Sequence, residues 1–240
     1  MSERPALVAV AHGTRDGRDT PAVRALLRRV AALRPGLTVR EAYLQFADPL
    51  AADSLAAAGD AVAVPLLLSP GYHVRADLPQ AVAAAATASG RAPARIAAVL
   101  GPDPLLTEAL VGRLGEAGWV PGDPVVLAAA GSSDPAAIAT VRTAGRLLAE
   151  ATGSPVTAAF AAAAEPSIVR AVADLRAAHP CRIAVASYLI AAGHFHDLAA
   201  AAGADLVAGP LADHPALARL VLARYDAALA ARRAPGSEPV

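Results

Sequence analysis

Near its N-terminus the chain reads ALVAVAHGTRD over residues 6–16. Six small or branched apolar residues in a row are typical of a strand that is buried on both faces of a parallel sheet. His12 and Gly13 follow this run, and a glycine at that point allows the chain to turn sharply into a helix whose N-terminus favours anions. The segment therefore predicts the first β–loop–α unit of an α/β domain, with a histidine at the sheet edge where ligands bind.

Strand-like and helical segments alternate along the rest of the chain. Further apolar, strand-like runs lie at residues 37–44, 61–68, 95–100, 124–130, 155–160, 182–190 and 204–208. Apolar residues recur at helical spacing between them, for example over residues 22–33, 134–150, 165–178 and 215–230. This alternation predicts βαβ units with right-handed crossovers and parallel sheets.

Four sequence landmarks occur twice and in the same order. VAVAHGTRD at 8–16 matches VLAAAGSSD at 126–134, FADP at 46–49 matches AAEP at 163–166, LLLSPG at 66–71 matches YLIAAG at 188–193, and LGP at 100–102 matches AGP at 208–210. We therefore expect two similar doubly wound domains, each with a parallel four-stranded sheet, over residues 1–120 and 121–240. The segment 118–124, with two prolines and two glycines, is the predicted linker.

Charge, hydropathy and cysteine content exclude several classes of protein. The 240 residues carry 21 basic and 21 acidic side chains, and every basic one is an arginine, with no basic run for a nucleic-acid partner. No apolar run reaches the ~18–20 residues of a membrane-spanning helix, and the N-terminus has no secretory pattern, so we expect a cytoplasmic protein. The single cysteine, Cys181, excludes an intramolecular disulfide and is interpreted as a small core residue.

Two histidines follow strand-like runs of the first half. His12 ends the first run and His73 comes shortly after the third. The first and third strands of a doubly wound half are neighbours, so both imidazoles should face one crevice. Together they could bind a divalent ion such as Fe²⁺, Co²⁺ or Ni²⁺, and either could accept a proton near neutral pH. The alternative is that each histidine only bonds to its own loop.

Other polar residues lie at the same predicted edge. Arginine suits carboxylate binding, although these arginines could equally be solvated surface charges. The candidates for substrate binding are Gly13, Thr14, Arg15, Arg18, Tyr72, Arg75, Ser132 and Ser133. In the second half Ala130 stands where His12 does, but His194 and His196 follow the matching strand and could bind metal from the other side of a cleft.

Longer motifs resemble a known family. They read AHGTRD at 11–16, YLQFADP at 43–49, VPLLLSPGYHVRADLP at 64–79 and LGPDP at 100–104. This combination is similar to the class II tetrapyrrole chelatases of the CbiX/SirB type, and the second half matches the degenerate copy of their long, two-domain members.

The resemblance implies insertion of Fe²⁺ or Co²⁺ into sirohydrochlorin, in sirohaem or cobalamin biosynthesis, at a cleft between two α/β domains. It implies that His12 and His73 bind the metal ion and accept protons, with no cofactor beyond that ion. Two fused copies could supply a whole cleft from one chain, so a monomer is plausible but not required. The family often has a glutamate where this chain has Gln45, which can offer a carbonyl oxygen to a metal but cannot take up a proton.

Two other functions remain open from the sequence. A carrier of metal or tetrapyrrole could use the same histidine pair without turnover. A histidine phosphatase also has His-Gly after its first strand, but it holds phosphate with an arginine directly before the histidine, where this chain has Ala11.

Overall fold

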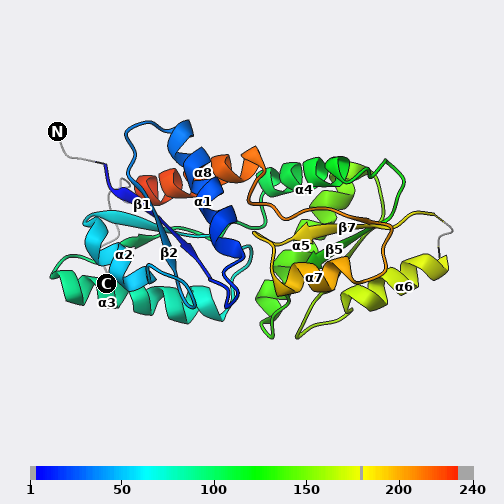
Figure 1. The fold of residues 1–240 in the computed structure, drawn as a ribbon, viewed down its shortest axis with the longest axis horizontal. Coiled ribbons are helices and arrows are strands. Elements are labelled where there is room, and N and C mark those ends of the chain that lie inside the picture. Colours follow the sequence, from blue (N-terminus) through cyan, green and yellow to red (C-terminus); the bar gives the residue numbers. More distant parts are fainter. Residues whose placement is uncertain (1–3, 179–180, 232–240) are drawn as a thin grey trace, which may run out of the picture.

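The computed structural model describes residues 4–178 and 181–231. Two four-stranded parallel sheets have the strand orders β2-β1-β3-β4 and β6-β5-β7-β8 (Figure 1). The first contains β1 (Ala6–Ala11), β2 (Val39–Tyr43), β3 (Ala61–Pro65) and β4 (Arg95–Ile96), and the second contains β5 (Val125–Ala129), β6 (Val156–Phe160), β7 (Ala184–Tyr188) and β8 (Leu206–Val207). The prediction of two doubly wound α/β halves is confirmed, and β1 and β3 are neighbours as expected.

Helices connect the strands in both halves. The first half has α1 (Asp19–Leu33), α2 (Ala51–Ala58), the π-helical turn η1 (His73–Asp77), α3 (Leu78–Ser89) and α4 (Pro104–Glu116). The second half has α5 (Pro135–Thr152), α6 (Ile168–Ala178), α7 (His194–Ala200) and α8 (Pro215–Ala230). Within the described residues, no helix is long and apolar enough to cross a membrane.

The central strands are buried on both faces, which explains their unbroken apolar sequence. In β1, Leu7 and Ala9 belong to a large apolar cluster, whereas Val8 and Val10 belong to a second cluster that includes residues of α2 and α3. The large cluster is continuous between the halves, because it contains residues of β1 and β3 as well as β5 and β7. Cys181 is exposed and precedes β7, so its interpretation as a core residue was wrong.

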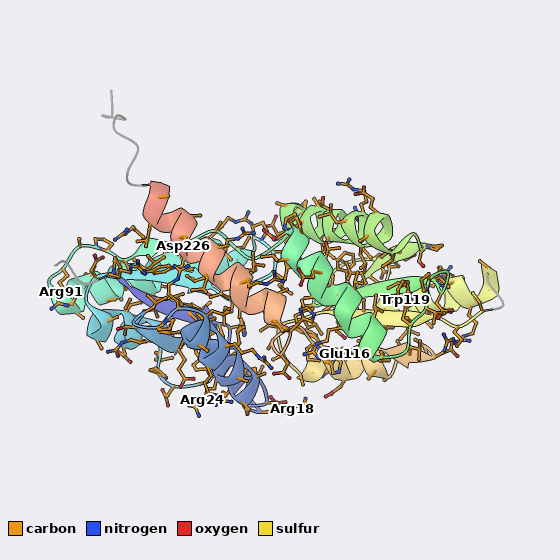
Figure 2. The ribbon with its side chains drawn as sticks, turned by 90° about the horizontal axis from the view of Figure 1, so that it is seen from above. Arg18, Arg24, Arg91, Glu116, Trp119 and Asp226 are labelled. Carbon is orange, nitrogen blue, oxygen red and sulfur yellow. The ribbon has the colours of Figure 1, made fainter. Side chains whose placement is uncertain are left out.

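The last helix of each half packs on the other half. α8 contacts α1 and β3 of the first half, while α4 contacts α5 and β7 of the second half (Figure 1). Figure 2 shows α8, with Asp226 labelled on it, lying over the first half. Arg224 of α8 donates hydrogen bonds to the backbone oxygens of Val99 and Leu100 and forms an ion pair with Asp103 at 3.0 Å. We refer to this arrangement of α4 and α8 as the helix exchange.

Side-chain caps define where three of the long helices begin. Asp103 and Asp134 each accept a hydrogen bond from the backbone two residues later, and His214 does the same through its ring nitrogen. Each cap is followed by proline, whose missing N–H needs no partner at the first helical position. The capping side chain and the proline after it therefore mark the first turns of α4, α5 and α8.

Candidate active site

One large cleft lies between the carboxyl ends of the two sheets. It has a volume of about 910 Å³ and is lined by loops that follow β1, β3, β5 and β7. Both halves therefore contribute to it, at the edge where open parallel sheets bind ligands. His12 and His73 line it from the first half, and His194 and His196 line it from the second.

Gly13 sets the path of the chain immediately after His12. Its φ is +87°, and a Cβ at this position would lie 1.8 Å from the backbone oxygen of Gln45. Gln45 in turn donates its backbone N–H to the oxygen of His12 at 3.0 Å. Only glycine fits between the two loops, so the turn after β1 is tied to the loop after β2 and His12 is held at the cleft. Gly131 makes the same close approach to Ala162 in the second half.

The two histidines of the first half meet face to edge in the cleft. Their Nε2 atoms are 3.0 Å apart, and their ring planes are inclined by 76°. The Nδ1 atom of His12 is 2.7 Å from the backbone oxygen of Gly13, and Nδ1 of His73 is 2.5 Å from Oδ2 of Asp77. An oxygen acceptor therefore faces Nδ1 of each ring, so we assign the N–H of each neutral imidazole to Nδ1.

This tautomer leaves one lone pair on the Nε2 atom of each ring, and the two Nε2 atoms face each other across the cleft. Two lone pairs at a separation of 3.0 Å repel each other unless a cation lies between or beside them. The pair can therefore share one proton or bind one metal ion, and a neutral imidazole does both readily. Among the residues that the structure describes, no group of three or more His, Cys, Asp or Glu side chains forms a metal site.

Asp77 is a site residue that the sequence reasoning missed. η1 brings it beneath His73, where it accepts the Nδ1 hydrogen bond. Carboxylates commonly orient ligating histidines in this way. The available signal was the four-residue spacing of His73 and Asp77 ahead of a helix, which places both on one side of a helical turn.

The three predicted carboxylate-binding arginines have different surroundings. Arg15 lines the cleft and lies over the ring of Phe46, with its guanidinium carbon 4.3 Å from the ring centre. Arg18 bonds to Asp16 in its own half and to Asp197 of α7 in the other, at 2.6 and 2.7 Å (Arg18 is labelled in Figure 2). Arg75 pairs with Asp134 at the start of α5. Arg18 and Arg75 thus bridge the two halves, and neither is among the residues that line the cleft.

These ion pairs change the proton affinity of the carboxyl groups. Hydrogen bonds from Arg18, with a smaller contribution from Thr14, lower the pKa of Asp16 to about 2. The hydrogen bond from Arg18 also lowers the pKa of Asp197. Both carboxyl groups therefore stay charged at neutral pH and remain available as partners of Arg18.

The remaining predicted residues mostly line the cleft but differ in their bonds. Thr14 donates a hydrogen bond to Asp19 at 2.7 Å, and Ser132 accepts one from the backbone of Asp134. His196 is 3.1 Å from the hydroxyl oxygen of the buried Ser187. Tyr72, Ser133 and His194 also line the cleft, and Tyr72 is 71% exposed. Gln45 contributes its backbone to the His12 turn but is not among the lining residues.

Tyr188 closes the floor of the cleft between the halves. It ends β7, and its hydroxyl donates a hydrogen bond to the backbone oxygen of Leu68, which follows β3, at 3.2 Å. Burial raises the pKa of Tyr188 well above its ordinary value, so the phenol stays protonated and remains a donor.

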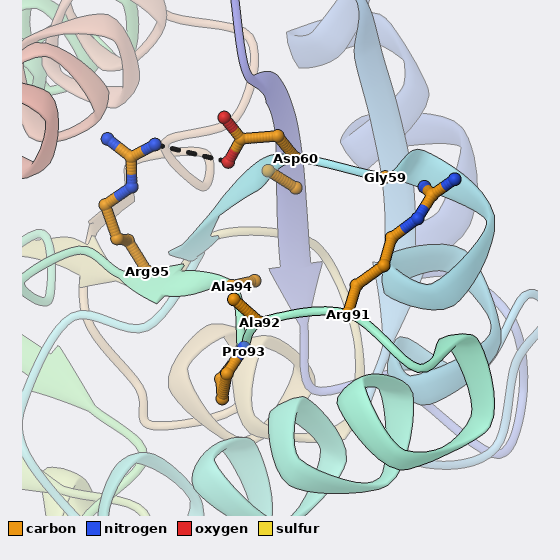
Figure 3. Close-up of a pocket in the computed structure, with 8 residues that line it drawn as sticks. Gly59, Asp60, Arg91, Ala92, Pro93, Ala94 and Arg95 are labelled. Carbon is orange, nitrogen blue, oxygen red and sulfur yellow. Dashed lines mark hydrogen bonds and ion pairs between the residues drawn. The ribbon is translucent and has the colours of Figure 1, made fainter.

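A second, smaller hollow of about 380 Å³ lies at the opposite end of the first sheet (Figure 3). It is formed around the starts of β3 and β4, where Arg95 pairs with Asp60 at 3.2 Å. It is thus at the opposite end of the strands from the histidine pair.

The arrangement of two similar sheets with a histidine pair between them defines a chelatase-like protein of the two-domain kind. Its fold matches SirB from Bacillus subtilis with Fe³⁺, with a TM-score of 0.81 and 21% identity over 96% of this chain and 97% of that one. A second SirB structure, from B. subtilis subspecies spizizenii in complex with cobalt, gives a TM-score of 0.76 and 20% identity over 94% and 95% of the two chains.

A family model identifies the chain more narrowly. The CbiX model matches it twice, over residues 6–117 and 124–228, and the chain belongs to the CbiX family. A CbiX structure described as the terminal enzyme for biosynthesis of siroheme in denitrifying bacteria is 27% identical, with a TM-score of 0.69 over 92% of this chain and 99% of that one. Among curated proteins, no sequence matches significantly.

Proposed function

We propose that this protein is a chelatase that inserts a divalent metal ion, Fe²⁺ or Co²⁺, into sirohydrochlorin. The observation that carries the proposal is the pair of imidazole nitrogens in the shared cleft, 3.0 Å apart and each with its other ring nitrogen fixed by an acceptor. Membership of the CbiX family and the SirB fold, whose structures contain iron or cobalt, support the same reaction.

The spacing of the two nitrogens suits one ion of the proposed kind. With metal–nitrogen bonds of about 2.1 Å, a separation of 3.0 Å corresponds to an angle of about 90° at the metal. That is the angle between adjacent ligands of an octahedral ion, and six-coordinate Fe²⁺ and Co²⁺ have this geometry. The two histidines would occupy adjacent positions and leave the rest for water and then for the macrocycle.

The reaction exchanges one metal ion for two pyrrole protons. His12 and His73 hold the ion as neutral imidazoles, and transfer of the ion to the macrocycle frees their Nε2 atoms. Each freed Nε2 then accepts one of the two pyrrole protons and releases it to solvent. Asp77 keeps the His73 ring in position through these steps.

The rest of the site suits an anionic macrocycle. Arg15 lines the cleft and can pair with a carboxylate of the substrate rim, while Thr14, Tyr72, Ser132 and Ser133 offer polar groups around it. Because one chain supplies both walls of the cleft, a monomer is sufficient. The proposal places the reaction in the cytoplasm and needs no cofactor other than the substrate metal ion.

Absorbance spectra during incubation with metal-free sirohydrochlorin and, separately, Fe²⁺, Co²⁺ or Ni²⁺ test this function. We expect product in excess of the protein concentration and a rate above the uncatalysed insertion. The variants His12→Ala and His73→Ala should each lose this rate while keeping the far-ultraviolet circular dichroism of the native fold. Full activity in the double variant would overturn the assignment, product limited to the amount of protein would indicate a carrier, and hydrolysis of a phosphate ester would indicate a phosphatase.

A further inference from the structure

Phe46 stands at the centre of an unusually tight turn on the rim of the cleft. The backbone N–H of Ala47 donates to the oxygen of Gln45 at 2.9 Å, so the turn encloses Phe46 alone. Its φ is +64°, in the left-handed region that residues with a side chain rarely adopt. A three-residue turn with this sign of φ is rare and strained, and strain of this kind gathers at functional sites.

The Phe46 ring contributes little to the core. The residue is 46% exposed and lines the cleft, with its ring centre 6.1 Å from that of His12. The guanidinium of Arg15 lies against the ring at 4.3 Å, which is a cation–π distance. An exposed aromatic ring beside the histidine pair, stacked by an unburied arginine, presents an apolar surface and a positive charge together.

The second half provides an internal comparison for this turn. Ala163 occupies the matching position, 117 residues later, and has a φ of +58°. A positive φ at this point of the loop therefore does not depend on an aromatic side chain. Since the ring of Phe46 is not needed for this φ, another role has to account for it.

We propose that Phe46 is a substrate-binding residue whose ring packs against the face of the macrocycle next to His12, while Arg15 on the same ring pairs with a rim carboxylate. This inference rests on the proposed function and adds to it the group that binds the flat, conjugated part of the substrate. The macrocycle is a planar π system with carboxylates at its edge, and the protein offers it the aromatic ring of Phe46 with the guanidinium of Arg15 beside that ring. The ring thereby holds the pyrrole nitrogens over the histidine pair.

Titration of the metal-free protein with sirohydrochlorin, followed by absorbance, tests the inference without requiring turnover. Phe46→Ala should weaken macrocycle binding and raise KM by about tenfold, with kcat at saturation within about a factor of two, because the lost contact serves binding. Phe46→Tyr should restore binding, and Phe46→Leu, which keeps bulk but not the π system, should lie between the two.

Leu50→Ala is the matched control, because Leu50 is similarly exposed at 43% and follows the same loop but does not line the cleft. It should bind sirohydrochlorin as the native protein does. Unchanged binding in Phe46→Ala would overturn the inference even if the native protein is an active chelatase. Absence of turnover in the native protein would instead overturn the proposed function, and the binding titration would still decide the role of Phe46.

A double variant separates the ring from the arginine. If the ring contacts the macrocycle, Phe46→Ala should weaken binding further when it is added to Arg15→Gln. If Phe46→Ala has no effect in the Arg15→Gln background, the ring acts only by holding Arg15, and the proposed contact with the macrocycle is wrong.

Discussion

Replacement of Asp77 by alanine isolates the positioning of one histidine. The carboxylate accepts the Nδ1 hydrogen bond of His73 at 2.5 Å, whereas His12 is held by a backbone oxygen that no substitution removes. The variant should therefore leave one imidazole fixed and allow the other to rotate. Because the metal ion needs both Nε2 atoms, we expect slower metallation with little change in the fold.

The size of the effect follows from the exposure of the pair. Hydrogen bonds to charged groups contribute about 1.5–3 kcal/mol, and the lower end applies here because the His73 side chain is 38% exposed and that of Asp77 is 21% exposed. A loss of about 1.4 kcal/mol is a tenfold change in rate. This agrees with the roughly 10–100-fold cost of removing a residue that orients a metal-binding histidine. Asp77→Asn keeps an acceptor for Nδ1 without the charge and should lose less.

Initial rates of metal insertion at saturating sirohydrochlorin measure this effect. The control is Asp53→Ala, since Asp53 is an exposed aspartate on α2, away from the cleft. We expect kcat to fall about tenfold in Asp77→Ala and to be unchanged in the control. If Asp77→Ala keeps native kcat while His73→Ala is inactive, the carboxylate does not position the imidazole and the reasoning fails.

Three other predictions concern stability and charge. Gly13 has a φ of +87°, and a Cβ there would lie 1.8 Å from a backbone oxygen, so Gly13→Ala should lower the free energy of unfolding by about 2–4 kcal/mol. Gly17 has a φ of +66° but lies in open space, so Gly17→Ala should lower it by only about 1–2 kcal/mol. Equal losses for the two variants in urea unfolding would contradict this. On α4, Gly112→Ala places a Cβ 2.5 Å from the ring of His214, which caps α8, and should lower the melting temperature. Gly115→Ala contacts nothing and should raise the free energy of unfolding by about 0.5–1 kcal/mol. A gain in stability for both variants would show that the His214 ring moves freely. The hydrogen bond from Arg18 lowers the pKa of Asp197 in the folded protein, so this ion pair contributes stability above the ordinary pKa of 3.8. That stability is lost as the pH falls through the lower pKa of the folded protein. An NMR titration that gives Asp197 a pKa of 3.8 or more would exclude the ion pair in solution.

Much of the fold could be predicted because local pattern and topology agree. The bounds expected for Ala6–Ala11 and Pro215–Ala230 are those observed, since an apolar run that ends at His-Gly and a helix that begins at His-Pro carry their own boundaries. The duplicated landmarks predicted equal strand orders in the two halves, and parallel sheet rules then placed His12 and His73 together.

The helix exchange had no counterpart in the sequence pattern. Apolar residues at helical spacing indicate that α4 and α8 pack on a sheet, but not on which one. Only the three-dimensional packing, with contacts such as Arg224 on the backbone of residues 99 and 100, selects one.

The partners of the arginines depended on contacts between the halves. Arg18 and Arg75 were sensible carboxylate ligands by chemistry, yet each pairs with a carboxylate of the other half, Asp197 and Asp134, that is distant in sequence. Phe46 was visible only as part of a repeated landmark, because backbone strain leaves no mark in composition or periodicity.

The helix exchange also limits how far the two halves can move apart. Because α4 and α8 each cross to the other half and the large apolar cluster continues between the sheets, the two halves are not free to swing apart on a hinge without exposing that cluster. The ion pair of Arg18 with Asp197 also joins the two halves, but it is exposed, and such pairs contribute little in water. We therefore expect the two halves to move as one body, and added salt to weaken only the exposed ion pairs between them.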